Sequence, residues 1–342
     1  MPARIATDCW ALKAAARFAG VAWAIACLAP LGQAQTRLGE TEIVFATRDE
    51  AAALLSARDD FVQRMSPFDR AARLKTDAEV SEQQYLQFVA RNVLSWEDEN
   101  REKMHRVVAA VAPQIAELRL PLPPKIYLVR TSGEEEGGAF YTRGAAIVFP
   151  TKRLADSADS LAKAFCHELF HVLSRAQPQL RQALYGAIGY QPCNEVDLPG
   201  DLAARKITNP DAPRIDQCIE LAIDGQQQWA VPVLYSRSRQ YDPRQGGRFF
   251  RYLEFRFLAV ERDAQGKASP LLRDGQPVLI EPDEAGGLFE QIGRNTQYII
   301  HPEEVIADNF ALLVMGKRNV ESPDVIHRIQ QVLKDRAAAY PE

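Results

Sequence analysis

One segment near the middle of the chain places polar side chains where a core helix would normally be apolar. Residues 165–171 are Phe-Cys-His-Glu-Leu-Phe-His, and apolar residues dominate from 161 to 173. This pattern predicts a buried helix, in which His167, Glu168 and His171 would be costly without partners. Because residues four apart lie one turn apart on the same helix face, the two imidazoles can converge on one metal ion.

The His-Glu-x-x-His spacing is typical of zinc. A catalytic Zn²⁺ takes three protein ligands in a tetrahedral arrangement and leaves the fourth position for water. Glu168 follows the first histidine directly and can reach that water as a general base. The alternative interpretation is that His167 and His171 only pack or form hydrogen bonds inside the helix.

A third zinc ligand has to come from another part of the chain. Of the five histidines, His105 and His327 lie in segments predicted to be surface helices. The stretch 298–310 is a better candidate, because it predicts an apolar helix that begins at Pro302 and has two glutamates in its first turn.

Glu304 and Asp308 are four residues apart on that predicted helix and share one face. Together with His-Glu-x-x-His, this Glu-x-x-x-Asp pattern resembles the gluzincin metallopeptidases. The resemblance implies that Glu304 is the third zinc ligand and that Asp308 orients a zinc-bound histidine, His167. Glu303 and His301 remain alternative ligands, and a further alternative is that the two glutamates only stabilise the helix dipole.

An edge strand next to the zinc helix extends the resemblance. Residues 137–150 are rich in glycine, aromatic and β-branched residues and predict a hairpin or edge strand, after a strand at 125–129. The resemblance implies that Gly-Ala-Phe-Tyr at 138–141 binds an extended substrate through main-chain hydrogen bonds, and a structural strand is the alternative. The candidates for stabilising the oxyanion beside zinc are Tyr298, His301, Tyr141 and Arg143.

The first 34 residues predict a secretory signal peptide. Three basic residues precede an apolar run from 18 to 31, and Gly-Gln-Ala at 32–34 forms a small-x-small cleavage pattern. Lipoprotein processing at Cys27 is a less favoured alternative. The mature chain would then be secreted or periplasmic, and no later stretch is apolar for long enough to predict a membrane span.

Charge and cysteine content restrict the partners. Removal of three basic residues and one acidic residue with 1–34 changes the formal charge from −4 to −6, and no basic run predicts nucleic-acid binding. Three cysteines remain, of which Cys166 is predicted to pack as a small hydrophobe. Cys193 and Cys218 could form a disulfide in an oxidising compartment.

The order of predicted elements indicates an α+β fold with a zincin-like core. We expect one metallopeptidase domain over 35–342, made of a mostly helical part (35–120), strands plus the zinc helix (121–176), an insertion with a β-rich part (177–300), and C-terminal helices carrying the third ligand (301–342). The further helices are predicted at 49–65, 81–94, 96–118, 179–187, 302–317 and 323–339, and antiparallel strands at 229–279. Loops of the insertion are expected to border the cleft.

These features imply a zinc metallopeptidase that acts on a peptide or protein. His167, His171 and Glu304 would bind Zn²⁺, and Glu168 would accept the proton of the attacking water. The alternatives are a secreted zinc-binding scaffold or interaction protein without turnover, and a metal-free interaction domain. Glu168 argues against a scaffold, because a structural zinc site needs no base beside its ligand.

Overall fold

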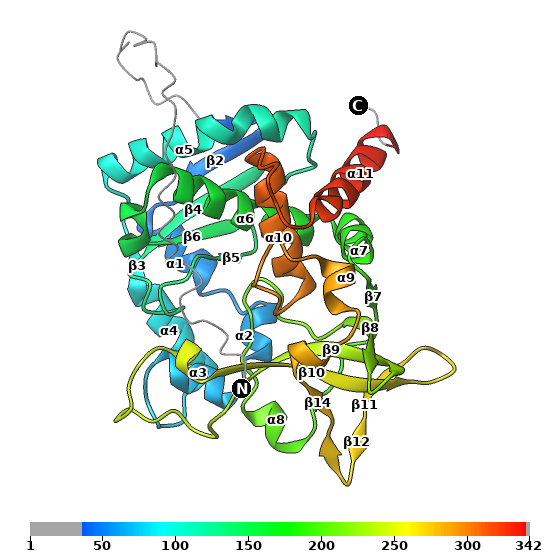
Figure 1. Cartoon of the computed structure of the whole chain (residues 1–342). Coiled ribbons are helices and arrows are strands. Elements are labelled where there is room, and N and C mark those ends of the chain that lie inside the picture. Colours follow the sequence, from blue (N-terminus) through cyan, green and yellow to red (C-terminus); the bar gives the residue numbers. More distant parts are fainter. Residues whose placement is uncertain (1–35, 340–342) are drawn as a thin grey trace.

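The computed structural model describes residues 36–339, and the chain is mixed α+β as the sequence predicts (Figure 1). The predicted signal peptide and Cys27 lie outside the described residues. Among the described helices, none combines the length and the apolar character that a membrane crossing requires.

The first sheet contains the predicted strand at 125–129 and the hairpin that follows it. β2, β4 and β6 run parallel, and β5 pairs antiparallel with β6 and forms one edge. The strands, in spatial order, are β1 (Thr36–Leu38), β2 (Thr41–Phe45), β4 (Lys125–Thr131), β6 (Ala146–Pro150) and β5 (Tyr141–Arg143), with β3 (Val93–Leu94) pairing with β4.

The edge strand begins later than predicted. β5 starts at Tyr141, whereas the sequence prediction placed the substrate-binding strand at 138–141. Gly137 and Gly138 have φ values of 60° and 79°, which belong to turns and not to extended strands. The main-chain groups of β5 are therefore those of 141–143.

The N-terminal helices differ from the prediction in two places: a helix at 67–73 was not predicted, and one predicted helix is divided. The single helix predicted at 49–65 is two helices, because Asp59 has an extended backbone and caps the second one by accepting a hydrogen bond from the Val62 N–H at 3.1 Å. The helices are α1 (Arg48–Leu55), α2 (Asp60–Arg64), α3 (Pro67–Arg73), α4 (Glu82–Asn92) and α5 (Asp98–Glu117).

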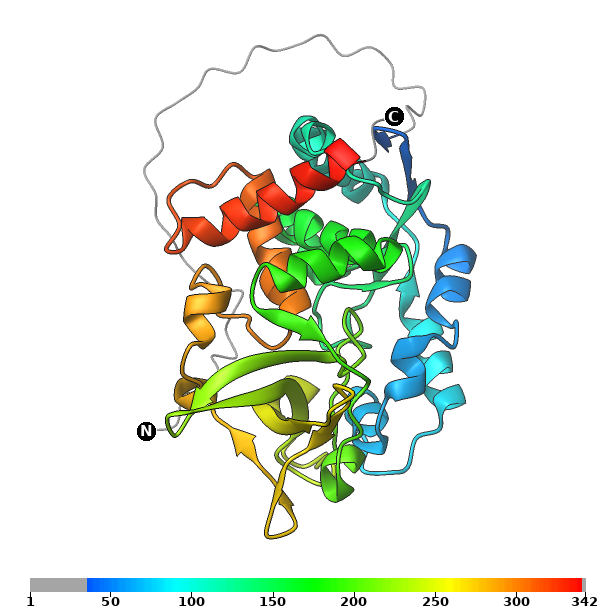
Figure 2. The same cartoon turned by 90° about the vertical axis from the view of Figure 1, so that its right-hand side faces the viewer.

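Two long helices from distant parts of the chain pack together in the core. α6 (Ala158–Ala176) begins after the cap Ser157, and α10 (Pro302–Val314) begins with proline at its first position, as predicted. The rings of Phe170 and Phe310 lie 5.7 Å apart between them. α6 also contacts β5 and β6, so the helix lies directly beside the sheet edge. Figure 2 shows α11 (Pro323–Ala339) crossing next to α10, and α7 (Pro178–Gly186) follows α6.

The second sheet is the predicted β-rich part of the insertion and occupies the lower part of Figure 1. It is antiparallel in the order β11-β10-β9-β8-β7, with β14 pairing with β10. Its strands are β7 (Tyr190–Pro192), β8 (Gln217–Ile223), β9 (Gln226–Ser236), β10 (Leu253–Arg262), β11 (Ala268–Pro270) and β14 (Leu279–Ile280). β12 (Leu272–Arg273) and β13 (Gln276–Pro277) form a small hairpin, and α8 (Gly200–Ala204) and α9 (Leu288–Ile292) are short helices.

A fully buried arginine links the N-terminal helices to the insertion. The Arg73 guanidinium pairs with Asp69 and with Glu136 Oε1 (2.7 Å), and it donates to the Thr208 carbonyl at 3.1 Å. We expect Arg73→Met to lower the free energy of unfolding by about 3–5 kcal/mol, because two buried carboxylates would lose their cation. Urea denaturation followed by circular dichroism measures this. A loss no larger than that of the exposed Arg106→Met would contradict it.

Cys193 and Cys218 are both free thiols in the structure. They lie against each other, and a hydrogen bond between the two thiols lowers the pKa of Cys218. The disulfide therefore stays a prediction. We expect a non-reducing peptide map of protein kept in an oxidising buffer to link these two cysteines, while Cys166, buried in α6, stays alkylatable after unfolding. Two alkylated thiols at 193 and 218 would contradict it.

Candidate metal centre

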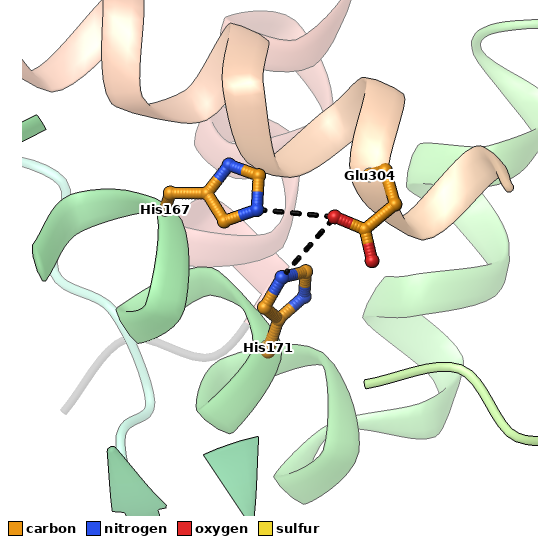
Figure 3. A group of neighbouring side chains, drawn as sticks. All are labelled: His167, His171 and Glu304. Carbon is orange, nitrogen blue, oxygen red and sulfur yellow. Dashed lines mark hydrogen bonds and ion pairs between the residues drawn. The ribbon is translucent and has the colours of Figure 1, made fainter. Parts of the chain in front are cut away.

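The structure brings together the three residues proposed as zinc ligands. Glu304 Oε2 lies 3.1 Å from His167 Nε2 and 3.6 Å from His171 Nε2, and one ligand atom from each residue falls within 4.8 Å of the others (Figure 3). Ligand atoms about 2.0–2.2 Å from a tetrahedral zinc are separated by about 3.3–3.6 Å. The spacing of the carboxylate from both imidazoles is close to this value.

Two buried atoms at this centre lack a hydrogen-bond partner among the described residues. They are His171 Nε2, which faces Glu304, and Glu168 Oε2, on the residue beside the first histidine. A bound Zn²⁺ would accept the lone pair of His171 Nε2. A water molecule on the metal would donate a hydrogen bond to Glu168 Oε2. The donor set and these unpaired atoms therefore fit zinc.

Asp308 approaches His167 from the side opposite Glu304. Asp308 Oδ1 lies 3.2 Å from His167 Nδ1, and the carboxylate also pairs with Lys163 (3.5 Å) and accepts a hydrogen bond from the Thr296 hydroxyl. A carboxylate at Nδ1 keeps the proton on that nitrogen and leaves the Nε2 lone pair for a metal.

Glu303 contacts the Nδ1 atom of His171 in the way that Asp308 contacts that of His167. Its Oε1 lies 2.9 Å from His171 Nδ1 and accepts the Ser174 hydroxyl at 2.6 Å, while the Tyr185 hydroxyl donates to Oε2. The sequence pattern leaves Glu303 as an alternative ligand or as a residue that stabilises the helix dipole. The structure instead makes it a fully buried partner of His171, on the side away from Glu304.

We expect the two supporting carboxylates to contribute equally to metal binding. Asp308→Ala and Glu303→Ala should each weaken zinc affinity by about 10- to 100-fold, because each leaves an imidazole without the group that fixes its tautomer. Competition with a fluorescent zinc chelator measures this, and exposed Glu290→Ala is the control. If Glu303→Ala matched the control, its contact with His171 would have no part in metal binding.

The charges around the centre favour a cation. Burial, and next the charge of Asp211, raise the pKa of Glu168 to about 8. Burial acts to lower the pKa of His171, but the charges of Asp211 and Glu304 and the hydrogen bond with Glu303 outweigh it and raise that pKa to about 9. Carboxylates also outnumber imidazoles at the centre, where Glu168, Asp211, Glu303, Glu304 and Asp308 surround His167 and His171. A divalent cation would balance their negative charge.

The candidates for oxyanion stabilisation are dispersed. The Tyr298 ring stacks on His167 with centroids 6.4 Å apart, and burial together with the charge of Glu304 raises the pKa of its hydroxyl well above the usual value. His301 caps α10, its Nδ1 accepting the Glu303 N–H at 3.1 Å. Tyr141 and Arg143 were the other two candidates.

Tyr141 and Arg143 both interact with carboxylates other than those of the candidate centre. The Tyr141 hydroxyl donates to Glu135 at 3.3 Å, and the Arg143 guanidinium pairs with Asp59. Tyr141 packs in a hydrophobic cluster with residues of the N-terminal helices, and this cluster contains none of the candidate metal ligands. Tyr298 is therefore the candidate donor that the structure places beside a metal-ligand ring.

The sequence pattern gave no indication of two polar residues at the centre. Asn209 Nδ2 donates to Glu304 Oε1 at 2.6 Å, and a carboxylate oxygen of Asp211 lies within 4.8 Å of ligand atoms of Glu168 and His171. Both belong to 205–216, a stretch between α8 and β8 without helix or strand. Its Asn-Pro-Asp-Ala-Pro sequence indicated only a loop. The expectation that insertion loops border the site agrees with these contacts.

A cavity of about 440 Å³ lies beside the centre and is lined by Ser174, Tyr185, His301 and residues 210–214, among others.

No protein-family model, curated protein or solved structure matches this chain. The assignment of the site therefore depends on its geometry and chemistry.

Proposed function

We propose that this protein is a zinc-dependent metallopeptidase of the gluzincin type with a zincin-like core. The observation that carries the proposal is the convergence of His167 and His171 on α6 with Glu304 on α10. Next to them lies the buried carboxyl group of Glu168, one oxygen of which has no hydrogen-bond partner among residues 36–339. The packing of α6 beside the edge strand β5 supports the fold assignment.

When bound, zinc would polarise a water molecule and the substrate carbonyl. Glu168 would take the proton of the attacking water and later deliver it to the leaving amine. Asp308 and Glu303 would hold the two imidazoles in position, and Tyr298 is the candidate donor to the developing oxyanion.

β5 is the edge strand of the first sheet, and the outward main-chain groups of an edge strand can bind an extended peptide, which supports a peptide as the substrate. With the predicted signal peptide, the proposed place of action is the periplasm or the exterior of the cell.

One observation favours a second candidate, a secreted zinc-binding scaffold without turnover. His171 and Glu304 are each 1% exposed, and a structural zinc site is normally closed in this way. For a substrate to reach the metal, the residues that cover the centre would have to move.

Cleavage of a mixed peptide library, analysed by mass spectrometry, tests the proposed function. We expect the zinc-loaded protein to hydrolyse peptides, chelation to stop the reaction, and added Zn²⁺ to restore it. The scaffold would be favoured if no peptide were cleaved by the fully zinc-loaded chain, nor by variants in which substitutions open the covered centre.

A further inference from the structure

The candidate metal centre is closed in this conformation. His167 and Glu168 are 3% exposed, and His171 and Glu304 are 1% exposed. A peptidase has to bring a substrate carbonyl within bonding distance of the metal and the general base. Another part of the chain therefore covers the position that a substrate would have to occupy.

The covering part is a loop of the insertion. Asn209 donates to the metal-ligand candidate Glu304, and the carboxylate of Asp211 lies next to Glu168 and His171. The Asp211 N–H in turn donates to Asn209 Oδ1 at 3.0 Å, so the two side chains are held as a unit. One short segment thus contacts both the ligand set and the proposed base.

The same segment occupies the edge strand. The Thr142 N–H donates to Asp211 Oδ1 at 2.8 Å, and the Thr142 hydroxyl donates to the same oxygen. Thr142 is the central residue of β5. A substrate that binds by strand addition needs the main-chain groups of this strand, so Asp211 takes a hydrogen bond that substrate would otherwise make.

The segment is anchored on both sides: after it, Arg214 pairs with Asp60 (2.6 Å) and the Ile215 carbonyl accepts the Val196 N–H at 2.8 Å. The Thr208 N–H donates to the buried Asp69 at 2.8 Å, and the Thr208 carbonyl accepts from Arg73. Beyond that anchor, Pro210 and Pro213 have no N–H and cannot continue a strand ladder along β5. Between the two anchors, the side chains of Asn209 and Asp211 make the hydrogen bonds that hold residues 209–213 in place, which permits displacement of this part alone.

We propose that residues 209–213 are an autoinhibitory segment and that the structure shows a latent form of the enzyme. Asp211 acts as a substitute for substrate, lying between the edge strand and the Glu168–His171 pair. Activity requires the segment to move out or to be cut. This inference rests on the proposed function for its biological meaning, but access to the metal can be measured without turnover.

The test uses acetohydroxamate, a small zinc-binding probe, and isothermal titration calorimetry on the zinc-loaded chain. We expect Asp211→Ala and Asn209→Ala each to bind the probe at least ~10-fold more tightly than wild type, because a site that is open only a tenth of the time loses that factor in apparent affinity. Peptide cleavage should rise in parallel. Asp201→Ala removes a half-exposed carboxylate of α8 that pairs with Arg205 and Arg239, and it should behave as wild type.

Zinc content and thermal unfolding of each variant show that it is folded and loaded, and Asn209→Ala keeps the charge of Asp211. Equal probe affinity in wild type and both variants would overturn the covering role, even if peptides are cleaved. Tighter probe binding in the variants without any cleavage would retain the covering role and reject the peptidase. A chain that binds no zinc would reject both.

Discussion

Glu168→Gln is expected to retain zinc and lose peptide hydrolysis by at least ~10²-fold, the usual contribution of a positioned general base. Glutamine has nearly the same size and can still form hydrogen bonds, but it cannot accept the proton of the attacking water. Glu168 is buried, with one carboxylate oxygen unpaired within the described chain, so the substitution breaks no structural contact of that oxygen.

The measurement is the initial rate of cleavage of a peptide selected from the library, with zinc determined by atomic absorption on the same samples. Exposed Glu290→Gln is the matched control, since it makes the same chemical change on the surface helix α9. If turnover of Glu168→Gln equalled that of the control, another residue would have to be the base. Loss of zinc together with activity would show that Glu168 acts in metal binding.

His167→Ala, His171→Ala and Glu304→Ala are each expected to abolish stable zinc binding. The proposed site has three protein ligands and no reserve, because the fourth position must stay free for water. Wild type should carry one zinc per chain after dialysis against a weak chelator, and each variant should carry close to none. Glu304→Ala is the most informative, because it comes from α10, far along the chain from the motif on α6.

His327→Ala is the control for the histidine variants, because His327 is exposed on α11. Full zinc occupancy in any of the three ligand variants would remove that residue from the ligand set. Retention in Glu304→Ala together with loss in Glu303→Ala would exchange the roles of the two glutamates. That result would contradict the orientation in the structure, where Glu303 faces Nδ1 of His171 and Glu304 faces Nε2.

The sequence alone determined the elements that carry the candidate ligands. His167 and His171 share a helix face because of the helical period, and Pro302 fixes the start of α10 and hence the register of Glu304 and Asp308. Local rules of this kind need no knowledge of distant contacts. Where local signals competed, as in the turn at Ser56–Asp59 that divides the predicted helix at 49–65, the prediction was wrong.

Tertiary structure decided which groups face the centre. Neighbouring glutamates on one helix point in different directions, and only the packing of α10 against α6 assigns Glu304 to the histidine Nε2 atoms and Glu303 to the far side of His171. Asn209 and Asp211 gave no signal, because a loop without periodicity can place its side chains anywhere that its anchors allow. The anchor at Thr208 depends on buried charges of α3, which lies more than a hundred residues earlier in the sequence. Contacts over such separations follow from the packing of the whole chain, which local sequence patterns do not encode.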